Sequence, residues 1–295
     1  MTGGELAIAL GGSRNGKWYN IPGPGHSSAD RSLGFCFDPL QPSGIGIFSL
    51  AGDDPATCRK HVINKLTLLG SGVLPVIELK AHEASDHAAT TAKALAIWHA
   101  AVAVAGSPAE SYLANRGCLP ASPACLNDIL RFHPTCPMGA TKVPAMVSIM
   151  RDASTGEPTG IHRTALADDG LAKRTMLNGM PAKMMLGPAA QAVVMLSKLA
   201  PSMGIAEGIE TALSAQKIFG LPVWACGSAR GIHRFPAIHG VHHLTIFADH
   251  DDPGIAAARK CGARLLKAGI KGGIKYPSTP GDDWNCYLQK GTHNV

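Results

Sequence analysis

The sequence predicts an α/β fold whose C-terminal third is a four-stranded parallel sheet with flanking helices. Three observations support this prediction: four short apolar runs, segments of helical spacing between them, and turn residues at the junctions. Apolar strands that are joined by helical crossovers favour a parallel sheet covered on both faces. The strands are expected at residues 203–206, 222–226, 244–248 and 273–276, and the main helices at 209–219 and 254–268.

Two further parts precede this sheet. The first 70 residues are rich in turns and carry apolar runs at 33–37 and 45–50, which predicts a small β-rich module. A helix near 55–68 would close that module, and a connector would follow it at 71–85. The remaining residues before the sheet are expected to form an α+β segment. The predicted domains are 1–70, 82–198 and 199–295.

The α+β segment begins with a predicted helix over residues 85–105, in which Leu95, Trp98 and Val102 form one apolar face. A second helix should begin after Ser107, because serine is a favoured N-cap and a proline follows it at the first helical position. Two strands with a turn between them are expected at 144–150 and 160–166.

Composition narrows the class of protein. The 295-residue chain is 45% hydrophobic and only 16% charged, so it can bury a substantial core and is not disordered. The net charge of +6 permits a polyanionic partner, although a soluble enzyme with surplus lysines explains it equally well. The eight cysteines include no C-x-x-C pair, and the longest apolar stretch, at 94–105, is too short to span a bilayer. We expect a cytoplasmic protein with no signal peptide and no membrane partner.

Acidic residues follow two of the predicted parallel strands. Glu207 comes directly after the first strand, and Asp249 and Asp251 follow the third. In such sheets, ligands bind at the carboxyl ends of the strands. If the chain stays extended through residue 251, the two aspartates lie on the same side. Carboxylate oxygens suit Mg²⁺, which binds few protein ligands and keeps waters for phosphate oxygens.

Structural explanations for these carboxylates remain open. Glu207 would also be favoured by the positive end of the helix that follows it. Asp252 precedes Pro253 and is interpreted as the N-cap of the next helix. For Asp249 and Asp251 alone, a structural role is as good an interpretation as a metal site. Three carboxylates at two strand ends of one sheet favour the metal site.

Three motifs together resemble the Toprim domain, which DnaG-type bacterial primases, topoisomerases and some nucleases share. They lie at residues 205–213, 247–254 and 281–285. The closest resemblance is to the primase-like Toprim proteins of phages, plasmids and other mobile elements, and it extends over nearly the whole chain. Residues 112–117 are similar to the segment that opens the catalytic core of these primases. Residues 160–164 are similar to the strand before the Toprim part.

The resemblance implies roles for four acidic residues. Glu207 would serve in acid–base or metal-linked chemistry. Asp249 and Asp251 would hold Mg²⁺, with Mn²⁺ as an alternative ion. Asp283 would match a further acidic position of the family and contribute to the metal site.

The sequence also departs from the family pattern. Cys286 and Thr211 stand where relatives tend to carry aspartate, so a second metal site remains open. The first 70 residues resemble the zinc-binding front end of these primases, but His26 is the one ligand kept, and Cys36 and Cys58 do not fall at the expected positions. Tetrahedral zinc needs four ligands. We therefore expect a degenerate, zinc-free module.

Four basic residues precede the Toprim part: Arg163, Lys173, Arg174 and Lys183. Cations position phosphates and neutralise their charge in phosphoryl transfer. In the primases that this chain resembles, basic residues of this region face template and nucleotide. For Lys173 and Arg174, a solvated hairpin is an equally good interpretation.

These features lead to one functional hypothesis and two alternatives. We expect a primase-like nucleotidyltransferase that uses Mg²⁺, a single-stranded DNA template and nucleoside triphosphates. The alternatives are a Toprim-type metal-dependent nuclease and a DNA-binding accessory protein whose catalytic ability has decayed. The sequence contains no G-x-x-x-x-G-K-[ST] phosphate loop, so any unwinding would need a separate helicase as partner.

Overall fold

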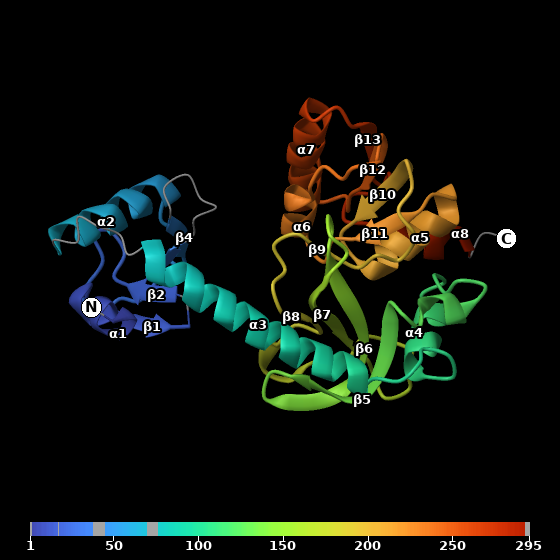
Figure 1. Ribbon diagram of the computed structural model, residues 1–295, viewed down its shortest axis with the longest axis horizontal. Helices are drawn as coiled ribbons and strands as arrows, with labels where there is room; N and C mark the ends of the chain where they lie inside the picture. Colours follow the sequence, from blue (N-terminus) through green and yellow to red (C-terminus); the bar gives the residue numbers. More distant parts are fainter. Residues whose placement is uncertain (1, 17, 38–44, 70–75, 293–295) are drawn as a thin grey trace. The chain divides into compact units, whose positions relative to one another are not determined.

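A computed structural model describes residues 2–16, 18–37, 45–69 and 76–292 of the chain (Figure 1). The chain divides into two compact units, residues 1–81 and residues 82–295. No helix in the described ranges is long and apolar enough to cross a membrane.

The first unit is built on a four-stranded antiparallel sheet, which confirms the predicted β-rich module. The helix after the sheet begins where Asp54 accepts a hydrogen bond from the backbone N–H of Thr57 at 2.8 Å. Phe35, Cys58 and Val62 are fully buried where sheet and helix pack together. The elements are α1 (Gly3–Ala9), β1 (Ser13–Asn15), β2 (Trp18–Ile21), β3 (Leu33–Phe37), β4 (Ile45–Ser49) and α2 (Pro55–Leu68).

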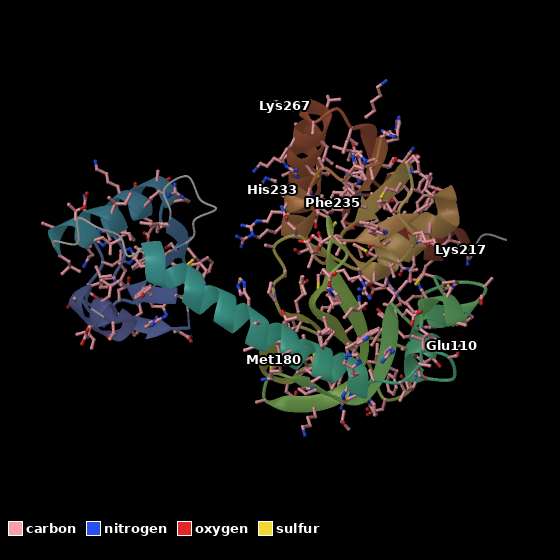
Figure 2. All side chains as sticks on the ribbon, viewed as in Figure 1. Glu110, Met180, Lys217, His233, Phe235 and Lys267 are labelled. Atoms are coloured by element: carbon pink, nitrogen blue, oxygen red, sulfur yellow. The ribbon has the colours of Figure 1, made fainter. Side chains whose placement is uncertain are left out.

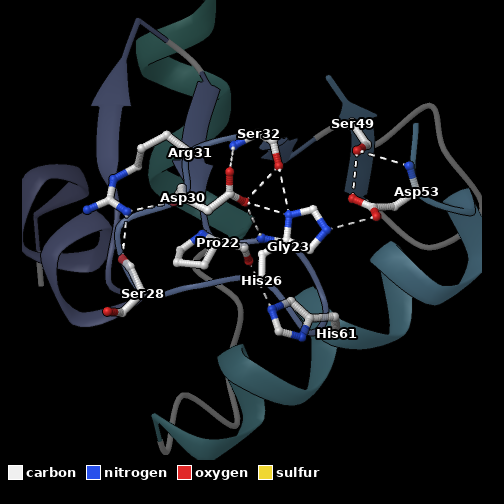
Figure 3. A network of polar contacts seen from close by, with 10 residues as sticks. All are labelled: Pro22, Gly23, His26, Ser28, Asp30, Arg31, Ser32, Ser49, Asp53 and His61. Carbon is white, nitrogen blue, oxygen red and sulfur yellow. Dashed lines mark hydrogen bonds and ion pairs between the residues drawn. The ribbon is translucent and has the colours of Figure 1, made fainter. Parts of the chain in front are cut away.

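A network of charged and polar side chains joins the loops of this unit (Figure 3). The two ring nitrogens of His26 lie 3.0 Å from Asp30 Oδ2 and 3.1 Å from Asp53 Oδ1. Ser32 donates to Asp30 at 2.7 Å, and Ser49 donates to Asp53 at 2.8 Å. Both nitrogens of His26 are therefore engaged by carboxylates, and the hydrogen bond to Asp30 raises the pKa of the ring. An imidazole ring whose two nitrogens both donate hydrogen bonds to carboxylates has no lone pair left to bind a metal ion.

The second unit begins with the end of α3 (Val76–Ala100) against an antiparallel sheet. Ala94, Ile97 and Trp98 are buried there. The prediction that Val102 continues the helical face is wrong. The helix ends at Ala100, and Val102 is exposed and exchanges backbone hydrogen bonds with Phe132 in an isolated β-bridge. The sheet contains β5 (Leu130–Met138), β6 (Thr141–Asp152), β7 (Pro158–Ala165) and β8 (Lys183–Leu186), and β9 (Ala192–Val193) pairs with β6.

The C-terminal part of this unit is a four-stranded parallel sheet in the order β11-β10-β12-β13, as predicted. Helices cover both faces of the sheet (Figure 1): α5 and α8 pack on one, α6 and α7 on the other. His233, Phe235 and Lys267 lie on the α6–α7 side (Figure 2). The elements are β10 (Ser202–Ala206), α5 (Ile209–Phe219), β11 (Val223–Ala225), α6 (Ala229–Arg234), β12 (His243–Phe247), α7 (Asp252–Lys267), β13 (Lys271–Lys275) and α8 (Trp284–Thr292).

One hydrophobic core joins the parallel sheet to the segment before it. Tyr112 and Leu113 of α4 (Pro108–Asn115) belong to the same buried cluster as Phe247 and Trp284. Hydrogen bonds reinforce the contact. The fully buried Asn285 donates to the carbonyl of Arg116 at 2.7 Å and to Ser214 Oγ at 2.9 Å. Lys217, labelled in Figure 2, donates to the carbonyl of Gly117 at 3.0 Å.

We predict that His26 titrates above its usual pKa of about 6.5, because Asp30 and Asp53 favour the protonated ring. The protonated His26 ring then stabilises the folded first unit fully at pH values below the usual pKa. This stabilisation is lost as the pH rises through the raised pKa. NMR titration of the His26 ring in the full chain measures the value, and Asp53→Asn should lower it.

The absence of zinc also stays a prediction. Elemental analysis of protein purified without chelators should give far less than one zinc ion per chain. Stoichiometric zinc, or a His26 pKa no higher than that of a free histidine, would contradict this account of the module.

Candidate active site

The acidic residues lie at the carboxyl ends of two neighbouring parallel strands. In the register of β10 and β12, Ala206 pairs with Phe247. Glu207 therefore follows one strand directly, and Asp249 follows the other after a single residue. The loop positions are fixed by backbone hydrogen bonds, because Gly227 N–H donates to the Glu207 carbonyl at 2.8 Å and Ala248 N–H donates to the Lys275 carbonyl at 2.9 Å.

Burial and mutual repulsion make these carboxylates hard to ionise. Burial raises the pKa of Asp249 to about 7, and the charges of Glu207, Asp283 and Asp251 add to the shift, while Lys183 opposes it. Burial also raises the pKa of Glu207, with Lys183 opposing the shift and Asp251 adding to it. The charges of three other carboxylates thus act on Asp249. We call these four residues the acidic centre: Glu207, Asp249, Asp251 and Asp283.

The acidic centre fits a divalent cation. Asp249 Oδ1 is buried and has no hydrogen-bond partner within the described residues. A buried carboxylate oxygen without a partner is costly, and a cation would satisfy it. Within the described ranges, no three histidine, cysteine or acidic side chains converge as ligands of one ion. Mg²⁺ does not require three, because it usually keeps several waters and binds through one or two carboxylates.

Asp251 has a structural role that the sequence assigned to its neighbour. We expected Asp252 to be the N-cap of the following helix, but Asp251 is the N-cap, and its Oδ1 accepts the Gly254 N–H at 2.7 Å. Asp252 is the first helical residue and is exposed, with Pro253 after it. One oxygen of Asp251 is thereby engaged in the cap, and the other stays available to a cation.

Asp283 also begins a helix. Its Oδ1 accepts the N–H of Cys286 at 2.7 Å, directly before α8. The next residue, Trp284, packs against Phe219 and Phe247 with ring centroids 4.9 and 6.0 Å away. The motif at residues 281–285 therefore has two roles. Asp283 belongs to the acidic centre, and Trp284 and Asn285 hold α8 in place.

Lys183 is the predicted basic residue that the structure brings to the acidic centre. Its Nζ lies 3.9 Å from the position that a Cβ at Gly208 would occupy, in the loop that begins with Glu207. Its positive charge partly offsets the rise in the pKa of both Glu207 and Asp249.

The other three predicted basic residues have protein partners. Lys173 forms an ion pair with Glu210 at 2.9 Å, and Arg174 forms one with the exposed Asp168 at 2.7 Å. Arg163 is only 5% exposed, and its guanidinium donates to the carbonyls of Pro137 at 2.5 Å and Met185 at 3.1 Å. A phosphate contact stays a prediction for all three.

Sequence reasoning missed the role of Glu210, which lies in the first turn of α5. Glu210 is 4% exposed, and its Oε1 accepts the hydroxyl of Tyr112 at 2.5 Å and pairs with Lys173 at 2.9 Å. Burial alone would raise the pKa of Glu210, but Lys173, Lys183 and Tyr112 outweigh burial and lower it. The only available signal in the sequence was a glutamate one turn after Glu207. Its partners, Tyr112 and Lys173, could not be recognised because they are distant along the chain.

Comparison with known families finds one match for each part of the second unit. Residues 202–293 match the Toprim domain family, and residues 88–196 match a domain of unknown function, DUF7146. Comparison with curated protein sequences finds no match.

Several solved structures are similar to the chain at low identity. The zinc-binding and RNA polymerase domains of the Aquifex aeolicus primase are 14% identical, with a TM-score of 0.47 over 97% of this chain and 79% of that one. A DNA primase domain from Pseudomonas aeruginosa is 14% identical, with a TM-score of 0.45 over 68% of this chain and 74% of that one. The primase fragment of the bacteriophage T7 primase-helicase protein is 14% identical, with a TM-score of 0.40 over 66% and 71%.

We predict a ranking of divalent-ion affinity among three asparagine variants. Changes to groups that merely support a metal ligand cost roughly 10–100-fold in affinity, so Asp249→Asn should cost at least that. Asp251→Asn should also weaken binding, although asparagine caps a helix as well as aspartate does. Asp252→Asn is the matched control and should bind like the wild type, since Asp252 is exposed outside the acidic centre.

Isothermal titration with Mg²⁺ and Mn²⁺ measures the three affinities, and circular dichroism checks that each variant folds. Equal losses for Asp252→Asn and Asp249→Asn would show that the acidic centre is wrongly assigned.

Proposed function

We propose, from the Toprim domain at residues 202–293, that the chain is a primase-like nucleotidyltransferase that makes primers on single-stranded DNA with Mg²⁺. The observation that carries this proposal is the acidic centre of that domain, where the partly buried carboxylates of Glu207 and Asp249 follow the neighbouring strands β10 and β12. The resemblance of residues 112–117 and 160–164 to a primase core supports primer synthesis over the other activities of Toprim domains.

Each residue of the acidic centre has a task in this proposal. Asp249 and Asp251 would hold the ion, which when bound neutralises and orients the phosphates of a nucleoside triphosphate. Burial raises the pKa of Glu207 above its usual value. A carboxylate with a raised pKa is a better proton acceptor, so Glu207 is suited to take the proton of an attacking 3′-hydroxyl. The charge of Lys183 faces the same loop and would bind a phosphate oxygen.

Two partners follow from this mechanism: a single-stranded DNA template and nucleoside triphosphates. The proposal also needs a separate source of unwinding, because the sequence contains no phosphate loop of a helicase motor. A separate helicase is the partner that would supply it.

The proposal is tested with purified protein, single-stranded DNA, Mg²⁺ or Mn²⁺, and labelled nucleoside triphosphates. Extension of new strands that disappears in Asp249→Asn supports the proposal. Metal-dependent loss of the DNA without synthesis would identify a nuclease instead. DNA binding with neither reaction would identify an accessory protein.

We predict that Lys183 contributes more to phosphate binding than Arg174 does. Each phosphate contact releases counterions, so losing one should reduce the salt dependence of binding by about one unit of slope. Lys183→Gln should show this reduction in affinity for single-stranded DNA or nucleotide measured across a salt series. Arg174→Gln is the comparison and should change the slope less, because that guanidinium is already paired with Asp168. An unchanged slope for Lys183→Gln would place Lys183 outside the phosphate path.

A further inference from the structure

Aromatic residues gather in one surface pocket beside the acidic centre. The whole chain is only 5% aromatic, yet four aromatic side chains line a single pocket of about 490 Å³ together with Lys275. We call it the aromatic pocket; its aromatic members are Phe219, Tyr276, Trp284 and Tyr287. A volume of this size accommodates a small ligand.

The aromatic pocket has a rigid floor and an open rim. Phe219 and Trp284 contact each other edge to face at 4.9 Å, and Phe219 stacks on the buried Phe247 at 4.9 Å. Tyr276 is 45% exposed and Tyr287 is 46% exposed. The packed rings fix the shape of the floor, so the two exposed tyrosines present aromatic faces to solvent at little conformational cost.

A ring contact joins the aromatic pocket to the loop of the acidic centre. The ring centroids of Tyr276 and His250 are 4.8 Å apart, and His250 lies between Asp249 and Asp251 in the chain. Backbone hydrogen bonds hold the loop in place: His250 N–H donates to the Asp282 carbonyl at 2.9 Å, and Gly281 N–H donates to the His250 carbonyl at 2.8 Å. The aromatic pocket therefore adjoins the loop that carries Asp249 and Asp251.

The chemistry of the aromatic pocket suits a nucleobase. Single-stranded nucleic acids are bound by aromatic side chains that stack on the bases and by cations that contact the backbone. The aromatic pocket offers both, because Lys275 Nζ lies 5.4 Å from the centroid of the Phe219 ring. An apolar protein partner would explain the exposed tyrosines but not the contact of Tyr276 with His250, in the loop of Asp249 and Asp251.

We propose that the aromatic pocket binds a nucleobase whose own phosphate, or the phosphate next to it, lies at the acidic centre. Tyr276 stacks on the base, and Lys275 contacts the backbone or the triphosphate. The base belongs either to the DNA strand or to a nucleoside triphosphate, and two probes separate these sources. The proposal rests on the proposed function for the identity of the ligand.

The test is equilibrium binding of two probes in Ca²⁺, so that no strand is extended or cut. The probes are ATP and a short fluorescent oligothymidylate, the latter compared with an abasic strand of equal length. Tyr276→Ala should weaken binding of at least one base-containing probe by about tenfold, within the range for one base on one aromatic ring. Tyr276→Phe keeps the ring and should restore binding. Phe48→Ala is the control, because Phe48 is a 54% exposed aromatic of the first unit.

The outcomes are decisive in both directions. A Tyr276-dependent affinity for ATP alone assigns the pocket to the incoming nucleotide, and one for oligothymidylate alone assigns it to the strand. The proposal is overturned if Tyr276→Ala binds both probes like the wild type, or if it loses affinity equally for the abasic strand. Binding in Ca²⁺ requires no synthesis, so a protein that makes no primers but shows this base dependence would overturn the proposed function and leave the pocket intact.

Discussion

Repulsion among carboxylates at the ends of β10 and β12 is the constraint on which the rest of the second unit depends. The parallel register leaves Glu207 and Asp249 beside each other, and burial prevents water from screening their charges. Like charges in a partly buried site raise one another's pKa, and such shifts cluster at functional sites. The fold tolerates this cost because positive charge can be supplied from outside the Toprim domain, by Lys183 at the start of β8 and by a bound cation.

A second buried carboxylate attaches the preceding segment to that domain. Glu210 receives the hydroxyl of Tyr112 from α4 and the ammonium of Lys173, so one side chain of the Toprim domain bonds to two parts of the matched segment at 88–196. Removing Lys173 would leave the buried Glu210 with less compensating charge, but Lys173 is one third exposed, so water lowers the cost below the roughly 3–5 kcal/mol that is typical of a fully buried pair. With the shared hydrophobic core, this network explains why residues 82–295 form one compact unit.

The sequence predicted the features that depend on local pattern. Strand–helix alternation identified the parallel sheet, and the position of Glu207 and Asp249 after apolar strands placed both at the same edge. The predicted N-cap of α7 was wrong by one residue. Aspartates at 251 and 252 are equally good caps before Pro253, and only the geometry of the folded loop determines that Asp251 is the cap.

The features that sequence reasoning missed depend on contacts between distant residues. Tyr112 and Glu210 are 98 positions apart, and neither side chain alone signals the other. Arg163 was one of the four predicted basic residues, but its partners are the carbonyls of Pro137 and Met185, which carry no sequence signature. The ring contact between His250 and Tyr276 likewise forms only when β12 and β13 pair.

Iron-directed cleavage tests the acidic centre most directly. Fe²⁺ with ascorbate and peroxide generates hydroxyl radicals at the bound ion, and these cut the backbone nearby. The account predicts cuts at Glu207 and its neighbours and in the loop of Asp249 and Asp251, mapped by mass spectrometry and suppressed by excess Mg²⁺. Cuts confined to other segments, or cuts at these loops that Mg²⁺ does not suppress, would contradict the claim that these strand ends hold the metal ion.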